Sequence, residues 1–317
     1  IGTHMVKALL DAGHEVVTLD NLSTGNRDLL PGGAFVLGDI ADRVVLEQVF
    51  TAHDFDAVMH FAAFTEVGES VLDPLKYYQN NVVGTLTLLK AMLRHKVDTF
   101  IFSSSAAVYG EPDNTLIVEA HPCRPTSPYG WTKLMVETVL QDYDRAYGLK
   151  SMALRYFNAA GADASGAIGE RHDPESHLIP LVLKVATGER DNITIFDTDH
   201  ATPDGTCVRD YIHVNDLVAA HLAGETATGR PSLRVYHGER SHVVQSGETL
   251  AAIAGRIAAG RVKLARLRLR LGKKPQAPER EQVEQETLHA SLLSQLLHFF
   301  FQGGDLTLQS ADFRLVL

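Results

Sequence analysis

Short apolar runs of strand length alternate with segments of helical periodicity from the first residue to about Gly224, and this alternation restricts the chain to few folds. The expected strands are the runs 15–20, 34–40, 57–63, 99–105 and 151–158. Apolar residues three and four apart predict helices over residues 5–10, 83–93 and 134–143, and Gly13 ends the first of these. Such alternation is typical of βαβ units. It predicts an α/β fold with a doubly wound, Rossmann-like parallel sheet.

The charge balance of the chain changes sign near residue 225. Up to Gly224 there are 16 Lys and Arg against 30 Asp and Glu, whereas from Glu225 onward there are 13 against 9. An acidic excess disfavours nucleic-acid binding, so none is expected for residues 1–224. The longest apolar runs fall well short of the roughly 18 residues that a membrane-spanning helix needs, and no signal-peptide pattern precedes the first helix. We therefore expect a cytoplasmic protein that does not bind a membrane.

The chain begins directly ahead of its first helix, with Ile1, Gly2, Thr3 and His4. A dinucleotide-binding fold opens with a buried strand and a glycine-rich turn, whose backbone N–H groups hold a pyrophosphate. If the chain has this fold, Gly2 is the last glycine of that turn. The sequence then predicts an N-terminally incomplete fold, which lacks the first strand and the other glycines.

Two acidic residues end neighbouring expected strands, at Asp20 and Asp39. At the first position a carboxylate could accept hydrogen bonds from the ribose hydroxyls of adenosine, which favours NAD over NADP as the cofactor. At the second, it could bind the adenine amino group. Because Asp also ends strands as an ordinary turn residue, a purely structural role remains open for both.

The most specific group of residues is Ser105, Tyr129 and Lys133, in the contexts FSSSAAVYG and SPYGWTK. Tyr129 and Lys133 are four apart on an expected helix, so the ammonium could lower the pKa of the phenol from about 10 towards neutral pH. A phenolate is a general base for a sugar hydroxyl, and Ser105 could hydrogen-bond the same oxygen. A packed aromatic and a solvated cation would explain the bare spacing. Here the pair follows a strand that ends in three serines, which favours catalysis.

Several stretches resemble, in order and spacing, the UDP-galactose (UDP-glucose) 4-epimerase family of the extended short-chain dehydrogenase/reductases; they include DNLSTGN, YYQNNVVGT, FIFSSSAAVYG, SPYGWTK, LRYFNAAGA and DGTCVRDYIHV. The resemblance implies that NAD is held tightly, reduced and reoxidised in each turnover, and that a UDP-sugar is the substrate. Tyr129 would take the proton of the sugar 4-hydroxyl while a hydride leaves C4. The resulting 4-keto sugar would take the hydride back on its other face.

The resemblance also implies binding residues, position by position. Beside Tyr129 and Lys133, those that would line the NAD site are Gly2, Asp20, Asn21, Asp39, Ile40, Phe61, Ala62, Ala63, Asn81 and Phe157. Beside Ser105, those that would hold the UDP-sugar are Asn158, His177, Leu178, Thr194, Phe196 and Arg209. The planar guanidinium of Arg209 suits a diphosphate, whereas structural roles remain open for Asn158 and His177. No metal is expected.

These observations predict three segments. Residues 1–158 form the NAD-binding, Rossmann-like domain, residues 159–224 begin a smaller nucleotide-sugar-binding part, and residues 225–317 form a divergent, atypical tail. In that tail Arg256–Lys274 has eight basic residues and no acidic ones. The pattern could bind RNA or an anionic membrane, although a solvated segment is the simpler explanation.

The expected activity is the reversible, NAD-dependent conversion of UDP-galactose to UDP-glucose by an isomerase. Two departures leave an inactive truncated or chimeric protein open as the alternative: Thr65 stands where many family members have a Lys beside the nicotinamide, and the residues after Gly224 lack the expected nucleotide contacts. A nucleotide-sugar dehydratase needs an acid pair where this chain has Ala106 and Ala107, which disfavours it. The helices over 83–93 and 134–143 could form a homodimer, although core packing explains their apolar positions equally well.

Overall fold

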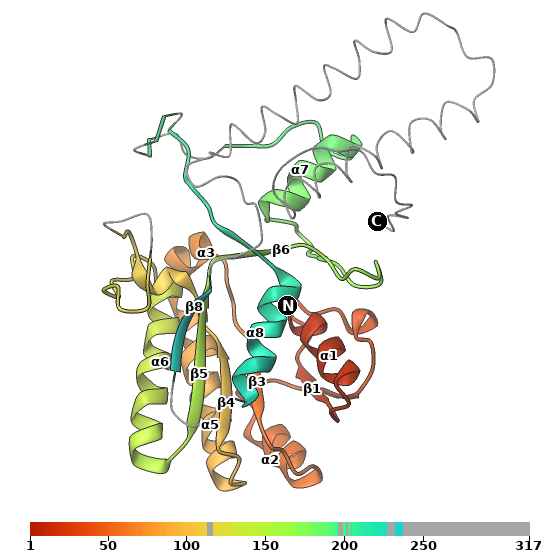
Figure 1. Ribbon diagram of the computed structural model, residues 1–317, viewed down its shortest axis with the longest axis vertical. Helices are drawn as coiled ribbons and strands as arrows, with labels where there is room; N and C mark the ends of the chain where they lie inside the picture. Colours follow the sequence, from red (N-terminus) through yellow and green to blue (C-terminus); the bar gives the residue numbers. More distant parts are fainter. Residues whose placement is uncertain (113–116, 196–198, 201, 204, 227–231, 237–317) are drawn as a thin grey trace, which may run out of the picture. The chain divides into compact units, whose positions relative to one another are not determined.

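The computed structural model describes residues 1–112, 117–195, 199–200, 202–203, 205–226 and 232–236, and Figure 1 shows their course. They form two compact units. The first comprises Ile1–Ala159 and the described residues from Val214 onward, and the second comprises those from Ala160 to His213. Residues 237–317 of the predicted tail, with its basic segment, lie outside the described residues. Within the described part, no helix is both long enough and apolar enough to cross a membrane.

The first unit is built on parallel strands in two sheets. β1 (Val17–Asp20) pairs with β2 (Ala34–Leu37), and the larger sheet has the order β3 (Val58–His60), β4 (Thr99–Ser103), β5 (Lys150–Tyr156), β8 (Ser232–Tyr236). All five strands predicted from apolar runs are present, with shorter bounds. β8 was not predicted, and it falls within the segment assigned to the divergent tail. The described residues of that segment therefore contribute a strand, β8, to the sheet.

Helices cover both faces of the larger sheet, as a doubly wound fold requires. The long helices are α1 (Gly2–Asp11), α2 (Arg43–Ala52), α5 (Thr85–Arg94), α6 (Pro128–Tyr147) and α8 (Val214–Thr226). Side chains alternate along β4, so Phe100 and Phe102 pack against α2, α5 and α6, whereas Ile101 packs against α8. α1 lies beside α8, where Met5 is buried against Val218 (Figure 1). The predicted Rossmann-like α/β architecture is confirmed.

Helix α6 begins earlier and ends later than the helix predicted over 134–143. Ser127 caps its N-terminus, because the serine hydroxyl accepts a hydrogen bond from Gly130 N at 3.2 Å. Pro128 fits the first helical position, where no backbone N–H is needed. Gly148, in the left-handed conformation, ends the helix. These caps place Tyr129 in the first turn of α6.

The connection from β3 to α5 is helical. It contains α3 (Val67–Leu72), α4 (Pro74–Tyr77) and a π-helical turn, η2 (Tyr78–Gly84). Gly84 lies against Ile40, since a Cβ at Gly84 would lie 2.9 Å from Ile40 Cδ1. The small residue therefore allows this turn to approach the segment after β2. The described part of this unit also contains two short 3-10 helices, η1 (Arg27–Leu29) and η3 (Ala106–Tyr109).

Strand β6 (Asn158–Ala160) leads the chain into the second unit, which contains α7 (Leu178–Thr187) and β7 (Tyr211–His213). The sequence predicted a boundary after residue 158 and a second part that extends to residue 224. In the structure the chain returns to the first unit at Val214, because the start of α8 is buried against α1. Among the described residues, the second unit therefore ends at His213, whereas the predicted part extends to residue 224.

Candidate functional site

Ser105, Tyr129 and Lys133 come together where β4 ends. The Ser105 hydroxyl accepts a hydrogen bond from Ala107 N at 3.1 Å, which caps η3, and it also hydrogen-bonds the phenol of Tyr129. Tyr129 and Lys133 are buried one turn apart on α6, and Lys133 Nζ lies 5.8 Å from the centre of the Tyr129 ring. The structure thus brings the three residues together, while their catalytic role stays a prediction.

The ammonium of Lys133 occupies a buried position. Its Nζ donates a hydrogen bond to the Ser103 carbonyl oxygen at 2.8 Å and lies 5.0 Å from the centre of the Phe102 ring. Burial lowers the pKa of Lys133 to about 8, because removal from water disfavours the charged form, and the nearby Glu137 carboxylate opposes this effect. Lys133 is therefore mostly protonated at pH 7 and half deprotonated at about pH 8.

The pKa of Tyr129 differs from the prediction that Lys133 would make this phenol acidic. Burial raises the pKa of Tyr129, and the hydrogen bond with Ser105 offsets this only in part. Both members of the pair lose contact with water, and desolvation disfavours the phenolate as well as the ammonium. The predicted direction of the Tyr129 shift is therefore wrong, although the predicted proximity of the two side chains is found.

A buried ion pair that the sequence did not predict lies one helical turn beyond Lys133. Glu137 and Arg155 are 2% and 3% exposed, and Arg155 Nη2 lies 2.5 Å from Glu137 Oε2. Glu137 also accepts a hydrogen bond from Ser104 Oγ at 2.5 Å, and Arg155 donates one to the Tyr109 hydroxyl at 2.9 Å. The network links α6 and β5 to the segment after β4. The sequence feature that could have indicated this network is Glu137, a carboxylate four residues after Lys133 and therefore on the same helix face.

Asn81, which was predicted to line the NAD site, fills its hydrogen-bonding capacity within the protein. Its side-chain nitrogen donates to the Phe64 carbonyl oxygen at 3.0 Å and to Thr132 Oγ1 at 3.1 Å. Its side-chain oxygen accepts from Phe64 N and from Asn80 Nδ2, both at 2.9 Å. An amide has two donors and room for two acceptor contacts, so all four are used. Asn81 thus holds the segment after β3 against α6.

The polar residues predicted at the ends of β1 and β2 lie close together. Asn21 Nδ2 donates a hydrogen bond to Asp39 Oδ2 at 2.8 Å. Asp20 Oδ1 accepts one from Leu22 N at 2.7 Å, and a Cβ at Gly25 would lie only 2.6 Å from Asp20 Oδ2. The structure therefore gathers these side chains at the carboxyl edge of the small sheet. They also make the local turn contacts that were considered as the alternative.

The remaining residues predicted to line the NAD site also lie in the first unit. Gly2 begins α1, whose first turn has neither a capping side chain nor an acidic residue. Phe61 follows β3, and its ring centre lies 4.9 Å from that of His221 on α8. The others are Ala62 and Ala63, which come next after β3, Ile40, which is buried, and Phe157, which packs near η3.

The residues predicted to hold the UDP-sugar divide between the two units. Asn158 begins β6 at the end of the first unit. The second unit carries His177 and Leu178 at the start of α7, together with the exposed side chains of Thr194 and Arg209. Phe196 lies outside the described residues. Each unit thus carries part of the predicted set.

Known proteins resemble the chain over most of its described residues. Residues 1–231 match a family model described as the NAD dependent epimerase/dehydratase family. The UDP-glucose 4-epimerase of Halalkalibacterium halodurans is 54% identical over 221 residues, which cover 70% of this chain and 66% of that protein. The UDP-glucose 4-epimerase of Rhizobium meliloti is 51% identical over 222 residues, which cover 70% of this chain and 68% of that protein. The chain thus spans about two thirds of the length of these relatives.

Solved structures show the same architecture. A crystal structure of a UDP-glucose 4-epimerase has a TM-score of 0.75 and 48% identity, covering 81% of this chain and 78% of that one. The UDP-glucose 4-epimerase from Brucella ovis, solved in complex with NAD, has a TM-score of 0.74 and 45% identity, with coverages of 80% and 77%. The enzyme from Bifidobacterium longum, in complex with NAD+ and UDP, has a TM-score of 0.70 and 40% identity, with coverages of 74% and 73%.

Proposed function

Because this chain belongs to the NAD dependent epimerase/dehydratase family, we propose that it catalyses the reversible 4-epimerisation of a UDP-hexose, interconverting UDP-galactose and UDP-glucose. Support comes from relatives named UDP-glucose 4-epimerases and from neighbours solved with NAD or with NAD+ and UDP. The single observation that carries the proposal is that Tyr129 and Lys133 are buried one helical turn apart on α6, with Lys133 Nζ 5.8 Å from the centre of the Tyr129 ring.

Inversion at C4 requires that a proton and a hydride leave the sugar and that the hydride return to the opposite face. NAD, when bound, supplies the acceptor and donor of the hydride. Tyr129 first releases its own phenol proton to water, and the resulting phenolate oxygen takes the proton of the 4-hydroxyl while Ser105 holds the same sugar oxygen by a hydrogen bond. Lys133 is mostly protonated at pH 7, since its pKa is about 8, so a positive charge lies near the phenol when it ionises. The proton returns from Tyr129 once the hydride has been restored.

The residues of the first unit fit an NAD cofactor. The first turn of α1 has no capping side chain and no acidic residue, so its backbone N–H groups, with Gly2 at the start, suit a pyrophosphate. Asp20 ends β1 and Asp39 follows the neighbouring β2, where carboxylates suit ribose hydroxyls and the adenine amino group. The residues after β3, tied to α6 by Asn81, complete the predicted NAD-binding set.

We assign the UDP moiety to residues of the second unit and to Asn158, which precedes that unit in the chain. The exposed guanidinium of Arg209 suits the diphosphate, because its planar fork can donate two parallel hydrogen bonds to phosphate oxygens. His177 and Leu178 at the start of α7, with Thr194, complete the described part of this set.

Turnover of UDP-galactose tests the proposal. Purified protein incubated with UDP-galactose and NAD should form UDP-glucose, followed by the NMR signal of the anomeric proton. Tyr129→Phe keeps the ring and removes the hydroxyl, so it should lower kcat by at least about 100-fold. Tyr143→Phe, on the same helix and only partly buried, should retain activity. Absence of product at high protein concentration would favour a protein without catalysis, and an active Tyr129→Phe variant would remove this residue from the mechanism.

The outer face of α6 is the surface that we assign to a homodimer. Trp131 and Met135 on α6 are 43% and 40% exposed, and Val83 on the neighbouring turn η2 is 43% exposed. Large apolar side chains exposed on adjacent elements favour association. Light scattering should give a dimer mass for the unaltered chain and a monomer mass for Trp131→Glu, and equal masses would remove this face from any interface.

A further inference from the structure

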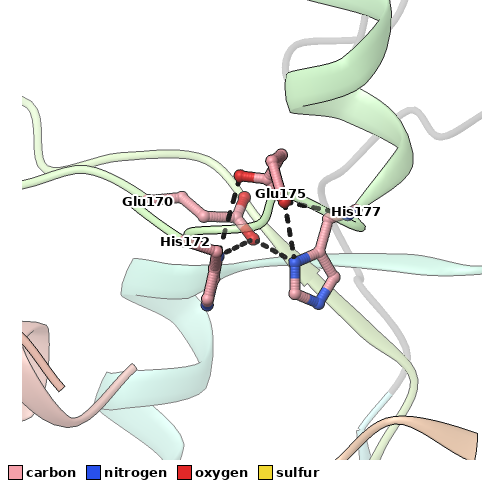
Figure 2. Close-up of side chains that lie close together, drawn as sticks. All are labelled: Glu170, His172, Glu175 and His177. Carbon is pink, nitrogen blue, oxygen red and sulfur yellow. Dashed lines mark hydrogen bonds and ion pairs between the residues drawn. The ribbon is translucent and has the colours of Figure 1, made fainter. Parts of the chain in front are cut away.

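Four side chains of metal-binding type meet in the loop that leads into α7, and the proposed function uses only one of them. Glu170, His172, Glu175 and His177, which we call the His-Glu cluster, offer one ligand atom each, and these atoms lie within 4.8 Å of one another. Figure 2 shows the four side chains close together, with dashed lines that join the two histidines to the two carboxylates. The cluster lies entirely in the second unit.

Each histidine nitrogen of the His-Glu cluster lies close to both carboxylates. His177 Nδ1 lies 3.0 Å from Glu170 Oε1 and 3.2 Å from Glu175 Oε1. His172 Nδ1 lies 3.5 Å from Glu170 Oε1 and 3.7 Å from Glu175 Oε2. A tetrahedral Zn²⁺ ion with ligands at about 2.0–2.1 Å separates neighbouring ligand atoms by about 3.3–3.4 Å. The four contacts range from 3.0 to 3.7 Å, and one ligand atom from each residue lies within 4.8 Å of the others, so the side chains would have to draw together around an ion.

The chemistry of the four donors favours a transition-metal ion over Mg²⁺ or Ca²⁺. Two carboxylates bring two negative charges, and a divalent cation balances them when both imidazoles are neutral. Imidazole nitrogen suits Zn²⁺, whereas Mg²⁺ and Ca²⁺ prefer oxygen ligands alone. Four protein ligands leave no open position for a substrate, which is typical of a structural zinc site.

The cluster is positioned by the chain around it. The Glu175 side chain is 5% exposed, and its Oε1 accepts a hydrogen bond from His177 N at 2.8 Å, which fixes this carboxylate. His177 directly precedes α7, so a ligand at this position is anchored to a helix. In Figure 2, Nδ1 of His177 faces the carboxylates while Nε2 turns away from them.

We propose that the His-Glu cluster binds one Zn²⁺ ion, which fixes the loop 170–177 at the start of α7. Zinc content and ligand identity test this without any assay of turnover. Full-length protein, freed of metal by a chelator and dialysed against Zn²⁺, should retain one zinc per chain by mass spectrometry. X-ray absorption at the zinc edge should show two imidazoles and no sulfur. The sulfur result matters because Cys207 lies in the same unit.

Paired variants with exposed substitutions separate this site from adventitious binding. His172→Ala combined with Glu170→Gln removes two ligands and leaves the buried Glu175 in place, and it should weaken Zn²⁺ binding by at least about 100-fold. His53→Ala combined with Glu15→Gln removes an exposed His and an exposed Glu from the first unit, and should bind Zn²⁺ like the unaltered chain. Circular dichroism of both variants checks that each is folded.

Three outcomes would overturn the zinc assignment: equal zinc affinity in both variants, sulfur among the ligands, or no zinc retained by the unaltered chain. Displacement of zinc by an equal concentration of Mg²⁺ would contradict the choice of metal. Each of these would leave the cluster as a set of His–Glu ion pairs. Because none of these measurements uses UDP-galactose, failure of the zinc site and failure of the proposed activity are distinguishable.

Discussion

Replacement of Lys133 by Met should stabilise the first unit at neutral pH. Burial lowers the pKa of Lys133 from 10.5 to about 8, and at about 1.4 kcal/mol for each pKa step this corresponds to about 3 kcal/mol of unfavourable free energy in the folded state. The variant also loses the hydrogen bond from Nζ to the Ser103 carbonyl oxygen, which offsets about 1 kcal/mol. We expect the free energy of unfolding at pH 7 to rise by about 2 kcal/mol.

This stabilisation should depend on pH in a defined direction. The folded protein releases the Lys133 proton near pH 8, while the unfolded chain keeps it until about pH 10.5. Below pH 8 both states hold the proton, so the difference between Lys133→Met and the unaltered chain is constant. Between the two values the unfolded chain binds more protons, so the unaltered protein gains about 1.4 kcal/mol of stability per pH unit relative to the variant. The difference between them therefore closes as the pH rises.

Urea unfolding followed by Trp131 fluorescence measures both effects, because Trp131 is the only tryptophan of the chain and lies on α6 with Lys133. Lys90→Met is the matched control on α5, where the lysine is exposed, and it should leave the free energy of unfolding unchanged. A Lys133→Met variant that is less stable than the unaltered protein at pH 7 would refute the reasoning. So would a stability difference that stays constant as the pH rises from 8 to 10.5.

Three further predictions concern residues of the first unit. Glu137→Gln leaves the charge of Arg155 without its partner carboxylate and should lower the free energy of unfolding by about 3–5 kcal/mol in the same urea assay. Gly110→Ala should lower it by at least about 2 kcal/mol, because φ of Gly110 is +69° and a Cβ there would overlap the Arg124 carbonyl oxygen; unchanged stability would contradict that overlap. His60 should stay neutral at pH 5, since burial lowers its pKa to about 3, and an NMR titration of its ring protons that moves between pH 5 and 8 would contradict this.

The parallel strands could be predicted because each buried strand of a βαβ unit is a local apolar run. The proximity of Tyr129 and Lys133 could be predicted for a similar reason, since helical spacing is a local property. Strand β8 could not be predicted in this way, because it is defined by its pairing with β5, far earlier in the chain. Its short apolar run also lies after residue 225, where the charge balance of the chain has already changed.

Properties that depend on tertiary packing could not be predicted from the sequence. The pKa of Tyr129 depends on how much water the surrounding elements exclude, and spacing along α6 carries no information about that. Glu137 and Arg155 are 18 residues apart in the chain and meet only because α6 packs on β5. The His-Glu cluster shows the same limit: its four residues are close in sequence, but only the loop conformation turns their ligand atoms toward one centre.

The hydrogen bonds of Asn81 couple two parts of the predicted site that a kinetic analysis would treat as separate. Through Phe64 they hold the segment that follows β3, and through Thr132 they hold α6 next to Lys133. A single amide therefore holds the segment after β3, which carries the predicted NAD contacts Phe61, Ala62 and Ala63, against the helix that carries the proposed proton acceptor Tyr129. Loss of that amide would weaken cofactor affinity and slow the chemical step together, so the defect would resemble that of a residue in direct contact with both reactants.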